Sequence, residues 1–290
     1  MNEPIYRNSL GWLPDYPDFR DYTVEHDDIK GMLRHIGVIK VTSLPESVDL
    51  RPWCSPIEDQ GELGSCTAHA GVGMVEYFEI RAFGKHVVGS RLFLYKVTRN
   101  LLHWTGDSGA FTRSMMGALV LFGLVPEEYW PYNIADFDKE PTAFCYAYAQ
   151  NFQSIDYYRL DPPGITPIKL LNQIKINISA GLPAICGFTI YSSYLQGMVS
   201  GKIPFPTSDE KIIGGHAVMV VGYDDTLKIK NSNIGSAETT GAFLIRNSWG
   251  AKWGVEGYGW LPYQYVTKRL AIDWWSLLKN EWVDTGAFKA

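Results

Sequence analysis

Apolar residues recur at helical spacing in the first half of the chain and form short unbroken runs in the second half. Ile29, Leu33 and Ile36 stand at positions i, i+4 and i+7, which predicts a short amphipathic helix. The pattern also predicts helices over residues 66–84, 91–102, about 107–122 and 165–180. Asp107 or Ser108 is the expected N-cap of the third of these.

The apolar runs at residues 183–190, 216–223 and 241–246 are short and unbroken, as is typical of buried strands. The polar stretch between the last two runs is expected to be a loop or an extension of a hairpin. Residues 47–53 are expected to form another strand, because Pro52 disfavours a helix there. A helical first half and a β-rich second half predict an α+β fold, with two lobes and a cleft between them.

The first 44 residues differ from the rest. Residues 13–22 are rich in Pro, Asp and Tyr, so we expect this stretch to be extended and pinned by its aromatic side chains. The whole segment is either an extension that packs on the main body or a propeptide that covers a cleft, and the sequence leaves both interpretations open.

Composition indicates an ordinary globular protein, with 46% hydrophobic and 20% charged residues. A net charge of -5 and the lack of basic runs argue against nucleic acid as a partner. The longest apolar run, residues 115–125, is too short to cross a bilayer and contains two glycines. The first seven residues lack the apolar core of a secretory signal. We therefore expect a protein without a membrane span that is cytoplasmic or exported without a classical signal peptide.

Cys54, Cys66, Cys145 and Cys186 are too few and too scattered for a disulfide scaffold, and their spacing assigns no pair. Cys66 and His69 have a C-x-x-H spacing, but no second pair of ligands accompanies them. We expect no metal site.

Cys66 is the first candidate for chemistry. Glycines and a serine precede it and a predicted helix follows, so its sulfur would face unpaired backbone N–H groups and the positive end of the helix dipole. Both favour the thiolate. Gln60 could direct an amide N–H into the same space, which is the layout of a nucleophile beside an oxyanion hole. A lone cysteine is more often inert, so whether Cys66 is reactive depends on partners elsewhere in the sequence.

Two such partners are His216, at the start of a predicted strand, and Asn247, which follows the next strand. A lone histidine in an apolar setting is more often structural. Asn247 lies among glycines and tryptophans, which would also suit an aromatic-packed turn. Together, however, Cys66, His216 and Asn247 provide a nucleophile, a base and a group that orients the base.

These residues lie in three sequence blocks. The motifs, and their order along the chain, resemble those of the papain-like (C1-type) cysteine peptidases. The blocks are Gln60-Gly61 to Cys66, Gly215-His216-Ala217, and residues 247–258 with the pattern N-S-W-G-x-x-W-G-x-x-G-Y. The likeness runs from about residue 43 to residue 265. It implies a two-lobed fold with a helical left lobe, mainly residues 58–150, and a β-barrel-like right lobe, mainly residues 151–270. Residues 1–44 would be the N-terminal segment and residues 45–290 the peptidase domain.

The resemblance implies a cysteine peptidase that hydrolyses polypeptides through a thioester and needs no cofactor. Cys66 and His216 would form a thiolate–imidazolium pair, and Asn247 would orient the imidazole. Gln60 and the backbone N–H of Cys66 would form the oxyanion hole. Trp249 would shield the bond between His216 and Asn247 from water.

The resemblance further implies that Gly109 and Gly215 bind substrate, although the glycine-rich segment around Gly109 is reduced. Leu63 replaces the usual cysteine and Thr67 the usual tryptophan, so the usual disulfide is absent. These departures are closer to bacterial branches of the family than to lysosomal cathepsins. Two alternatives remain, namely a non-catalytic peptide- or partner-binding protein on a peptidase fold, and a thiol deamidase or transpeptidase that uses the same residues.

Overall fold

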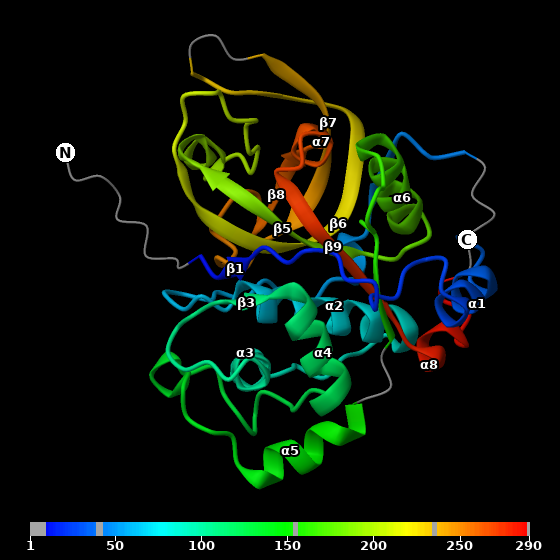
Figure 1. Cartoon of the computed structure of the whole chain (residues 1–290), viewed down its shortest axis with the longest axis vertical. Coiled ribbons are helices and arrows are strands. Elements are labelled where there is room, and N and C mark those ends of the chain that lie inside the picture. Colours follow the sequence, from blue (N-terminus) through cyan, green and yellow to red (C-terminus); the bar gives the residue numbers. More distant parts are fainter. Residues whose placement is uncertain (1–9, 39–42, 153–155, 234–236, 289–290) are drawn as a thin grey trace.

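The computed structural model describes residues 10–38, 43–152, 156–233 and 237–288. Helices α2 to α5 gather on one side of the molecule, in the lower half of Figure 1, and a large sheet occupies the upper half. The predicted α+β class is therefore confirmed.

The helices confirm most of the periodic pattern. The helices predicted over residues 66–84, 91–102 and 165–180 agree with the structure to within two residues at each end. The predicted short amphipathic helix forms around Ile29 and Leu33. The bounds are α1 Asp27–His35, α2 Cys66–Phe83, α3 Arg91–Leu101, α4 Thr112–Phe122, α5 Ala143–Ala149, α6 Pro167–Ser179, α7 Tyr263–Thr267 and α8 Asn280–Val283.

The sheet has seven strands in the described residues, with the order β4-β9-β5-β6-β7-β8 and β2 paired to β6. All its pairings are antiparallel. Within the described part of the chain the strand path stays open instead of closing into a barrel. The bounds are β2 Ser47–Asp49, β4 Asp156–Arg159, β5 Ala184–Tyr191, β6 Ile212–Lys230, β7 Glu238–Arg246, β8 Tyr258–Pro262 and β9 Ala271–Leu278.

The three predicted strands of the second half are confirmed, and two of them are longer than the apolar runs. β6 continues to Lys230 and β7 begins at Glu238, so the polar stretch between the runs is in large part an extension of their hairpin. The expected strand at residues 47–53 is only partly present. It ends at Asp49, and Arg51–Trp53 forms a 3₁₀ turn. Pro52 is tolerated there because the first residues of a helix need no N–H donor.

The start of α4 differs from the prediction. Neither Asp107 nor Ser108 caps the helix, which begins at Thr112 after Phe111. The Asp107 carboxylate instead accepts hydrogen bonds from the N–H of Gly64 at 2.9 Å and from the hydroxyl of Tyr95 at 2.6 Å. It therefore joins the loop in front of α2 to α3, a contact between distant segments that local sequence cannot indicate.

The N-terminal segment crosses between the helices and the sheet (Figure 1). Residues 10–13, here called the strap, include strand β1 (Trp12–Leu13), which pairs in parallel with β3 (Ala110–Phe111). Residues 14–18 form no helix or strand, and residues 19–20 form a turn, so the predicted extended stretch is interrupted. The expected aromatic pins are wrong at two positions. Tyr16 is 85% exposed and Phe19 94% exposed.

The predicted amphipathic helix α1 packs its Ile29 and Leu33 into the main core. The N-terminal segment therefore belongs to the folded body as well as passing over part of it. No helix within the described ranges is long and apolar enough to span a membrane.

Candidate active site

Cys66 is the first residue of α2 and has no exposed surface. The backbone N–H of Ala217, on β6, donates to its sulfur at 3.5 Å. The N–H groups of Gly11, Thr67 and Cys66 itself also favour the thiolate, but burial outweighs them and raises the pKa of the thiol to about 11. The helix start therefore presents the sulfur as predicted, whereas its burial keeps it protonated.

His216 and Asn247 lie on β6 and directly after β7, two neighbouring antiparallel strands. Nε2 of His216 and Oδ1 of Asn247 are 2.8 Å apart. The same Oδ1 accepts the N–H of Ser248 at 2.9 Å, which fixes the orientation of the amide. Nδ1 of His216 is buried and has no hydrogen-bond partner among the described residues. Sheet register thus brings together two residues that the sequence placed in separate blocks.

Trp249 lies against this histidine. Its ring centroid is 4.7 Å from that of His216, and the indole is only 6% exposed. Tyr194 packs edge-on against Trp249, with ring centroids 5.4 Å apart. Trp249 thus lies beside His216, and the hydroxyl of Tyr194 accepts a hydrogen bond from the Asn247 amide at 3.4 Å.

Gln60 lies at the junction between the helices and the sheet and is fully buried. Its Nε2 donates to the carbonyl of Leu63 at 2.9 Å, and its Oε1 accepts the hydroxyl of Ser248 at 2.5 Å. The backbone N–H of Gln60 also donates to the carbonyl of Ser248, at 2.8 Å. These bonds hold the amide in one orientation and fasten the loop before Cys66 to the loop that carries Asn247.

The strap covers the sulfur. Trp12 packs with Cys66 and Ala217 in one buried cluster. Gly11 lies so close to Gly64 that a Cβ on Gly11 would stand 1.8 Å from the Gly64 carbonyl oxygen. The segment over Cys66 can therefore carry no side chain at position 11.

Gly109 and Gly215, the two glycines expected to bind substrate, both contact the strap. A Cβ on Gly109 would stand 2.2 Å from the carbonyl oxygen of Gly11, and one on Gly215 2.7 Å from that of Trp12. The Gly11 carbonyl accepts the N–H of Ala110 at 2.8 Å. The space assigned to a substrate is occupied by the chain itself.

The expected thiolate–imidazolium pair is not favoured in this closed arrangement. Burial lowers the pKa of His216 to about 4, and the bond to Asn247 opposes this shift only in part. With the thiol pKa raised as well, both groups are neutral near pH 7. Burial is the physical reason for both shifts, and the strap contributes to it at the sulfur, where Trp12 packs against Cys66.

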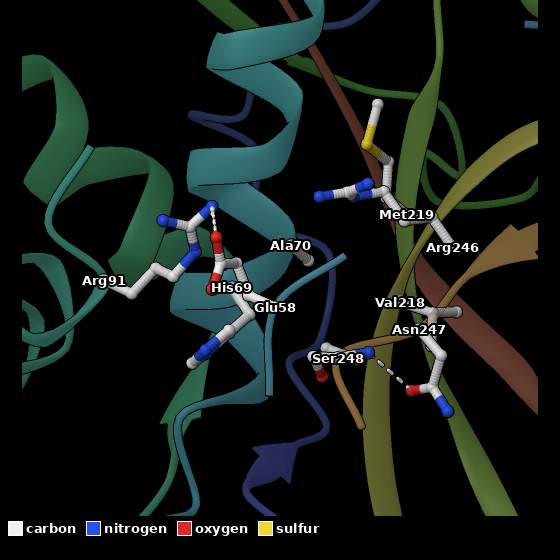
Figure 2. Close-up of a pocket in the computed structure, with 10 residues that line it drawn as sticks. Glu58, His69, Ala70, Arg91, Val218, Met219, Arg246, Asn247 and Ser248 are labelled. Atoms are coloured by element: carbon white, nitrogen blue, oxygen red, sulfur yellow. Dashed lines mark hydrogen bonds and ion pairs between the residues drawn. The ribbon is translucent and has the colours of Figure 1, made fainter. Parts of the chain in front are cut away.

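A small polar pocket lies behind the site, between α2 and the strands β6 and β7 (Figure 2). His69 lines it one turn along α2 from Cys66, and burial lowers the pKa of His69 to about 3. Glu58, Arg91 and Arg246 supply its charged walls. Among the described residues, no group of three or more His, Cys, Asp or Glu side chains could hold a metal ion.

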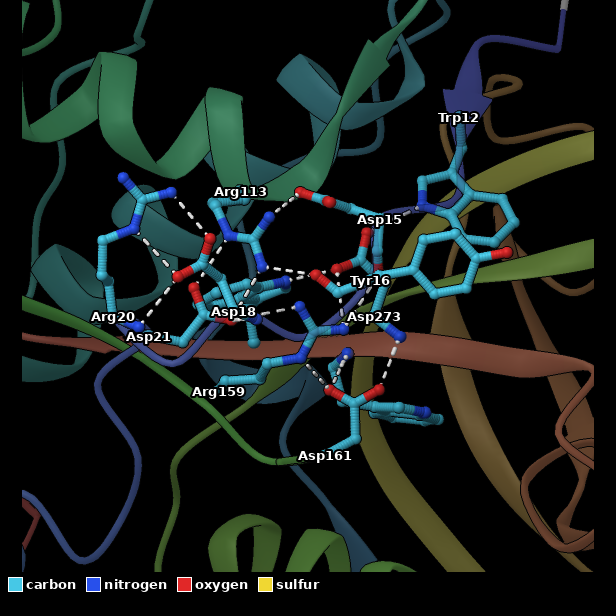
Figure 3. Close-up of polar contacts among 12 residues, drawn as sticks. Trp12, Asp15, Tyr16, Asp18, Arg20, Asp21, Arg113, Arg159, Asp161 and Asp273 are labelled. Atoms are coloured by element: carbon cyan, nitrogen blue, oxygen red, sulfur yellow. Dashed lines mark hydrogen bonds and ion pairs between the residues drawn. The ribbon is translucent and has the colours of Figure 1, made fainter. Parts of the chain in front are cut away.

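Beyond the strap, a network of ion pairs fastens the N-terminal segment (Figure 3). We call the side chains of Asp15, Asp21, Arg113, Arg159, Asp161 and Asp273 the anchor cluster. Arg113 binds Asp21 through two bonds of 2.8 and 2.7 Å and also pairs with Asp15. Arg159 bonds the Asp15 carbonyl at 3.1 Å and the Asp161 carboxylate at 2.9 Å.

Within this cluster the buried Asp161 carboxyl has a pKa raised to about 6 by desolvation, against the opposing charge of Arg159. The N-terminal segment is thus held by largely buried ion pairs instead of by aromatic packing.

Sequence reasoning missed Trp12 and Asp273, although both are buried beside Cys66 or the residues that touch it. Nε1 of Trp12 donates to Oδ2 of Asp273 at 3.1 Å. The local signal was the short apolar stretch Leu10, Trp12 and Leu13 around Gly11 in the N-terminal segment.

Comparisons with known proteins agree with this geometry. Residues 44–270 match the family described as papain family cysteine protease. The chain is 32% identical over 288 residues to an uncharacterized peptidase C1-like protein of Acanthamoeba polyphaga mimivirus, covering 95% of this chain and 88% of that one. It is 28% identical over 223 residues to human cathepsin L2. This match covers 74% of this chain and 60% of that one.

Among solved structures, xylellain, a cysteine protease from Xylella fastidiosa, superposes with a TM-score of 0.76 at 31% identity. The match covers 96% of this chain and 99% of that one. This likeness confirms the papain-like fold and agrees with the expected bacterial branch.

Proposed function

Because the chain belongs to the papain family of cysteine proteases, we propose that it hydrolyses peptide bonds with Cys66 as nucleophile, His216 as base and Asn247 as orienting residue. The observation that carries this proposal is the pairing of His216 Nε2 with Asn247 Oδ1 at 2.8 Å, which leaves Nδ1 as the unengaged ring nitrogen. The adjacent residue on β6, Ala217, contacts the sulfur through its N–H.

The hydrogen bonds of the Asn247 amide determine which ring nitrogen of His216 carries the proton. Since Oδ1 of Asn247 also accepts the Ser248 N–H, it is an acceptor toward His216 as well. Nε2 of His216 must then carry a proton, and in the neutral ring Nδ1 holds the lone pair. Nδ1 is therefore the atom that takes the proton of the Cys66 thiol.

In the proposed reaction, Cys66 attacks the carbonyl carbon of the substrate and the thiol proton passes to His216. The imidazolium gives that proton to the leaving amine, and a thioester remains on the sulfur. His216 then removes a proton from water, which attacks the thioester and frees the enzyme. Trp249 strengthens the bond between His216 and Asn247 by keeping it dry.

The oxyanion would be held by the Cys66 backbone N–H and the Gln60 side chain. Gln60 is fixed by Leu63 and Ser248, so it needs little reorganisation to act as a donor. Gly109 and Gly215 would contact the substrate where the strap now lies. Polypeptide is the substrate class that the family implies.

We assign the strap a second part of this function, the reversible closure of the site. It occupies the space in front of Cys66 and adds to the burial that raises the pKa of the thiol. The segment 1–44 would thus be both a cover and a packing extension, since α1 contributes buried residues to the core. Residues 45–290 would form the peptidase domain, helical mainly over 58–150 and β-rich mainly over 151–270.

The deciding experiment compares full-length wild type, Cys66→Ala and Cys145→Ala on a peptide library read by mass spectrometry. We expect Cys66→Ala to abolish cleavage, because no other group supplies the nucleophile. Cys145 is also free and buried but lies on α5, so its variant is the matched control and should retain activity. Cleavage that survives in Cys66→Ala would disprove the proposed site.

A further inference from the structure

The indole of Trp12 fills a pocket beside the sulfur, and the walls of this pocket are unusually free of side chains. A Cβ on Gly187 would stand 1.8 Å from Cε2 of the indole, and one on Gly215 2.7 Å from its Cε3. Ile272 and Ala217 complete the apolar wall, and Trp12 is only 6% exposed. The two glycines therefore create a flat space that any larger residue would close.

Asp273 forms the polar end of this pocket. Its Oδ2 accepts the indole N–H of Trp12 at 3.1 Å, while its Oδ1 accepts that of Trp275 at 2.6 Å. Arg159 stands 3.4 Å from the same carboxylate, which has no exposed surface. Asp273 also has a φ of 62°, a conformation that Asn and Asp tolerate better than other side chains. The carboxylate is thus held firmly, with one oxygen directed at the strap.

The main chain of the strap lies directly beside the nucleophile. Its Gly11 carbonyl takes the N–H of Ala110, and its Gly11 N–H points to the sulfur of Cys66. Trp12 is therefore the side chain of a peptide bound beside the nucleophile. When the strap leaves, Oδ2 of Asp273 loses its donor, and a buried carboxylate with a missing partner is costly.

From these contacts we propose that Asp273 determines specificity and that the pocket selects substrates with an indole side chain. The proposal rests on the proposed peptidase function and names a substrate preference for it. A tryptophan side chain fills the flat space and restores the N–H donor to Asp273. Arginine or lysine is disfavoured, because Arg159 already faces the carboxylate and would repel a second cation.

The test uses the full-length Trp12→Gly variant, which leaves the pocket vacant, and a Cys66→Ala blank. Blocked fluorogenic peptides carry tryptophan, β-(3-benzothienyl)alanine, phenylalanine or arginine at the first or the second residue before the cleaved bond. The benzothienyl side chain has nearly the shape of tryptophan but lacks the N–H. We expect kcat/KM for the tryptophan peptide to exceed that of the benzothienyl peptide by about tenfold or more at one of the two positions.

In Trp12→Gly/Asp273→Asn we expect this advantage to shrink, because the charge of the acceptor is lost while the positive φ is still tolerated. Equal rates for the tryptophan and benzothienyl peptides, or a preference for arginine, would overturn the proposal and leave the peptidase function intact. Such a result would mean that the pocket serves the strap alone. Loss of cleavage of every peptide, also in Gly11→Ala/Trp12→Gly, in which the main chain of the strap is displaced as well, would instead contradict the peptidase function.

A binding measurement separates the pocket from catalysis. Indole should raise the melting temperature of Trp12→Gly, benzothiophene should raise it less, and neither should affect wild type, whose pocket is filled. If Trp12→Gly does not fold, Trp12→Phe keeps part of the apolar packing and removes the donor, and the same peptides are compared on it. No difference between indole and benzothiophene would count against the role of Asp273.

Discussion

The strap and the anchor cluster hold the same N-terminal segment by different physical means. The strap is apolar, glycine-containing and packed against Cys66, and it excludes water from the sulfur. The anchor cluster is ionic, with Arg159 and Asp21 buried and Arg113 partly exposed, and it meets the strap at Asp273, which accepts the N–H of Trp12. We therefore infer different roles for the two regions. The strap blocks access to Cys66, and the anchor cluster holds the strap in position.

The largest effect is expected from Gly11→Ala. Its new Cβ would clash with the Gly64 carbonyl, and forced overpacking typically costs about 1–3 kcal/mol. We expect kcat/KM of the full-length chain, and the alkylation rate of Cys66 by iodoacetamide, to rise roughly tenfold to hundredfold. Gly31→Ala is the matched control, since a Cβ on Gly31 meets nothing within 4 Å. Unchanged rates in Gly11→Ala would show that the strap does not limit access.

The pH dependence of closure is expected to follow from His216. Its pKa is lowered from 6.5 to about 4 in the closed chain, so the closed state binds fewer protons than an open state with an ordinary imidazole. Closure is then complete above pH 6.5 and weakens as pH falls toward 4, by up to about tenfold per pH unit. The measurement is the ratio of wild-type to Gly11→Ala kcat/KM, which cancels the pH dependence of the chemistry. This ratio should increase on acidification.

Asp273 provides the control for that experiment. Burial raises its pKa, whereas the N–H of Trp12, which it accepts only while the strap is in place, lowers it. The same ratio is therefore measured in an Asp273→Asn background, which cannot titrate at this position, and the rise on acidification should persist there if His216 is the titrating group. A ratio that stays flat in both backgrounds would remove His216 as the titrating group.

A smaller effect is expected when the anchor cluster is weakened. Arg113→Gln removes the two-bond pairing with Asp21 and the pairing with Asp15, but the arginine is 25% exposed and the pairing is screened by solvent. We expect a loss of about 1 kcal/mol or less in thermal stability and only a few-fold rise in basal cleavage. Arg20→Gln, an exposed ion pair with Asp18 in the same segment, is the control. An activation as large as that of Gly11→Ala would mean that the anchor, and not the strap, determines closure.

The smallest effect is expected at the exposed aromatic residues. Phe19→Ser should change neither melting temperature nor basal cleavage measurably, because a side chain 94% exposed loses no packing. Tyr16→Ser should behave alike. A clear destabilisation by either variant would instead support the prediction that aromatic packing holds this stretch.

Much of the fold was predictable because it is local. The spacing of Ile29 and Leu33 gave α1, and the apolar run beginning at His216 gave the centre of β6. The candidate site was predictable for a related reason. Each of its three main residues lies in a short motif that can be recognised in the sequence. These residues are Cys66, which follows glycines, His216 and Asn247.

What could not be predicted are contacts between distant segments. Trp12 and Asp273 are 261 positions apart, and nothing near either residue specifies the other. Asp107 had the sequence of a helix cap, yet its carboxylate bonds the N–H of Gly64, because the fold brings that donor closer. Amphipathic spacing says which face is buried but not what covers it, so a strap over the sulfur could be expected only as one of two alternatives.

The direction of the strap has a consequence for inhibitor chemistry. The strap pairs in parallel with β3 and presents the N–H of Gly11 to the sulfur of Cys66. A short linear peptide that copies residues 10–13 in this sense would be a decoy without a scissile bond at the nucleophile. The chain thus contains a template for a non-covalent, hydrolysis-resistant ligand of its own site, with tryptophan as the anchoring group.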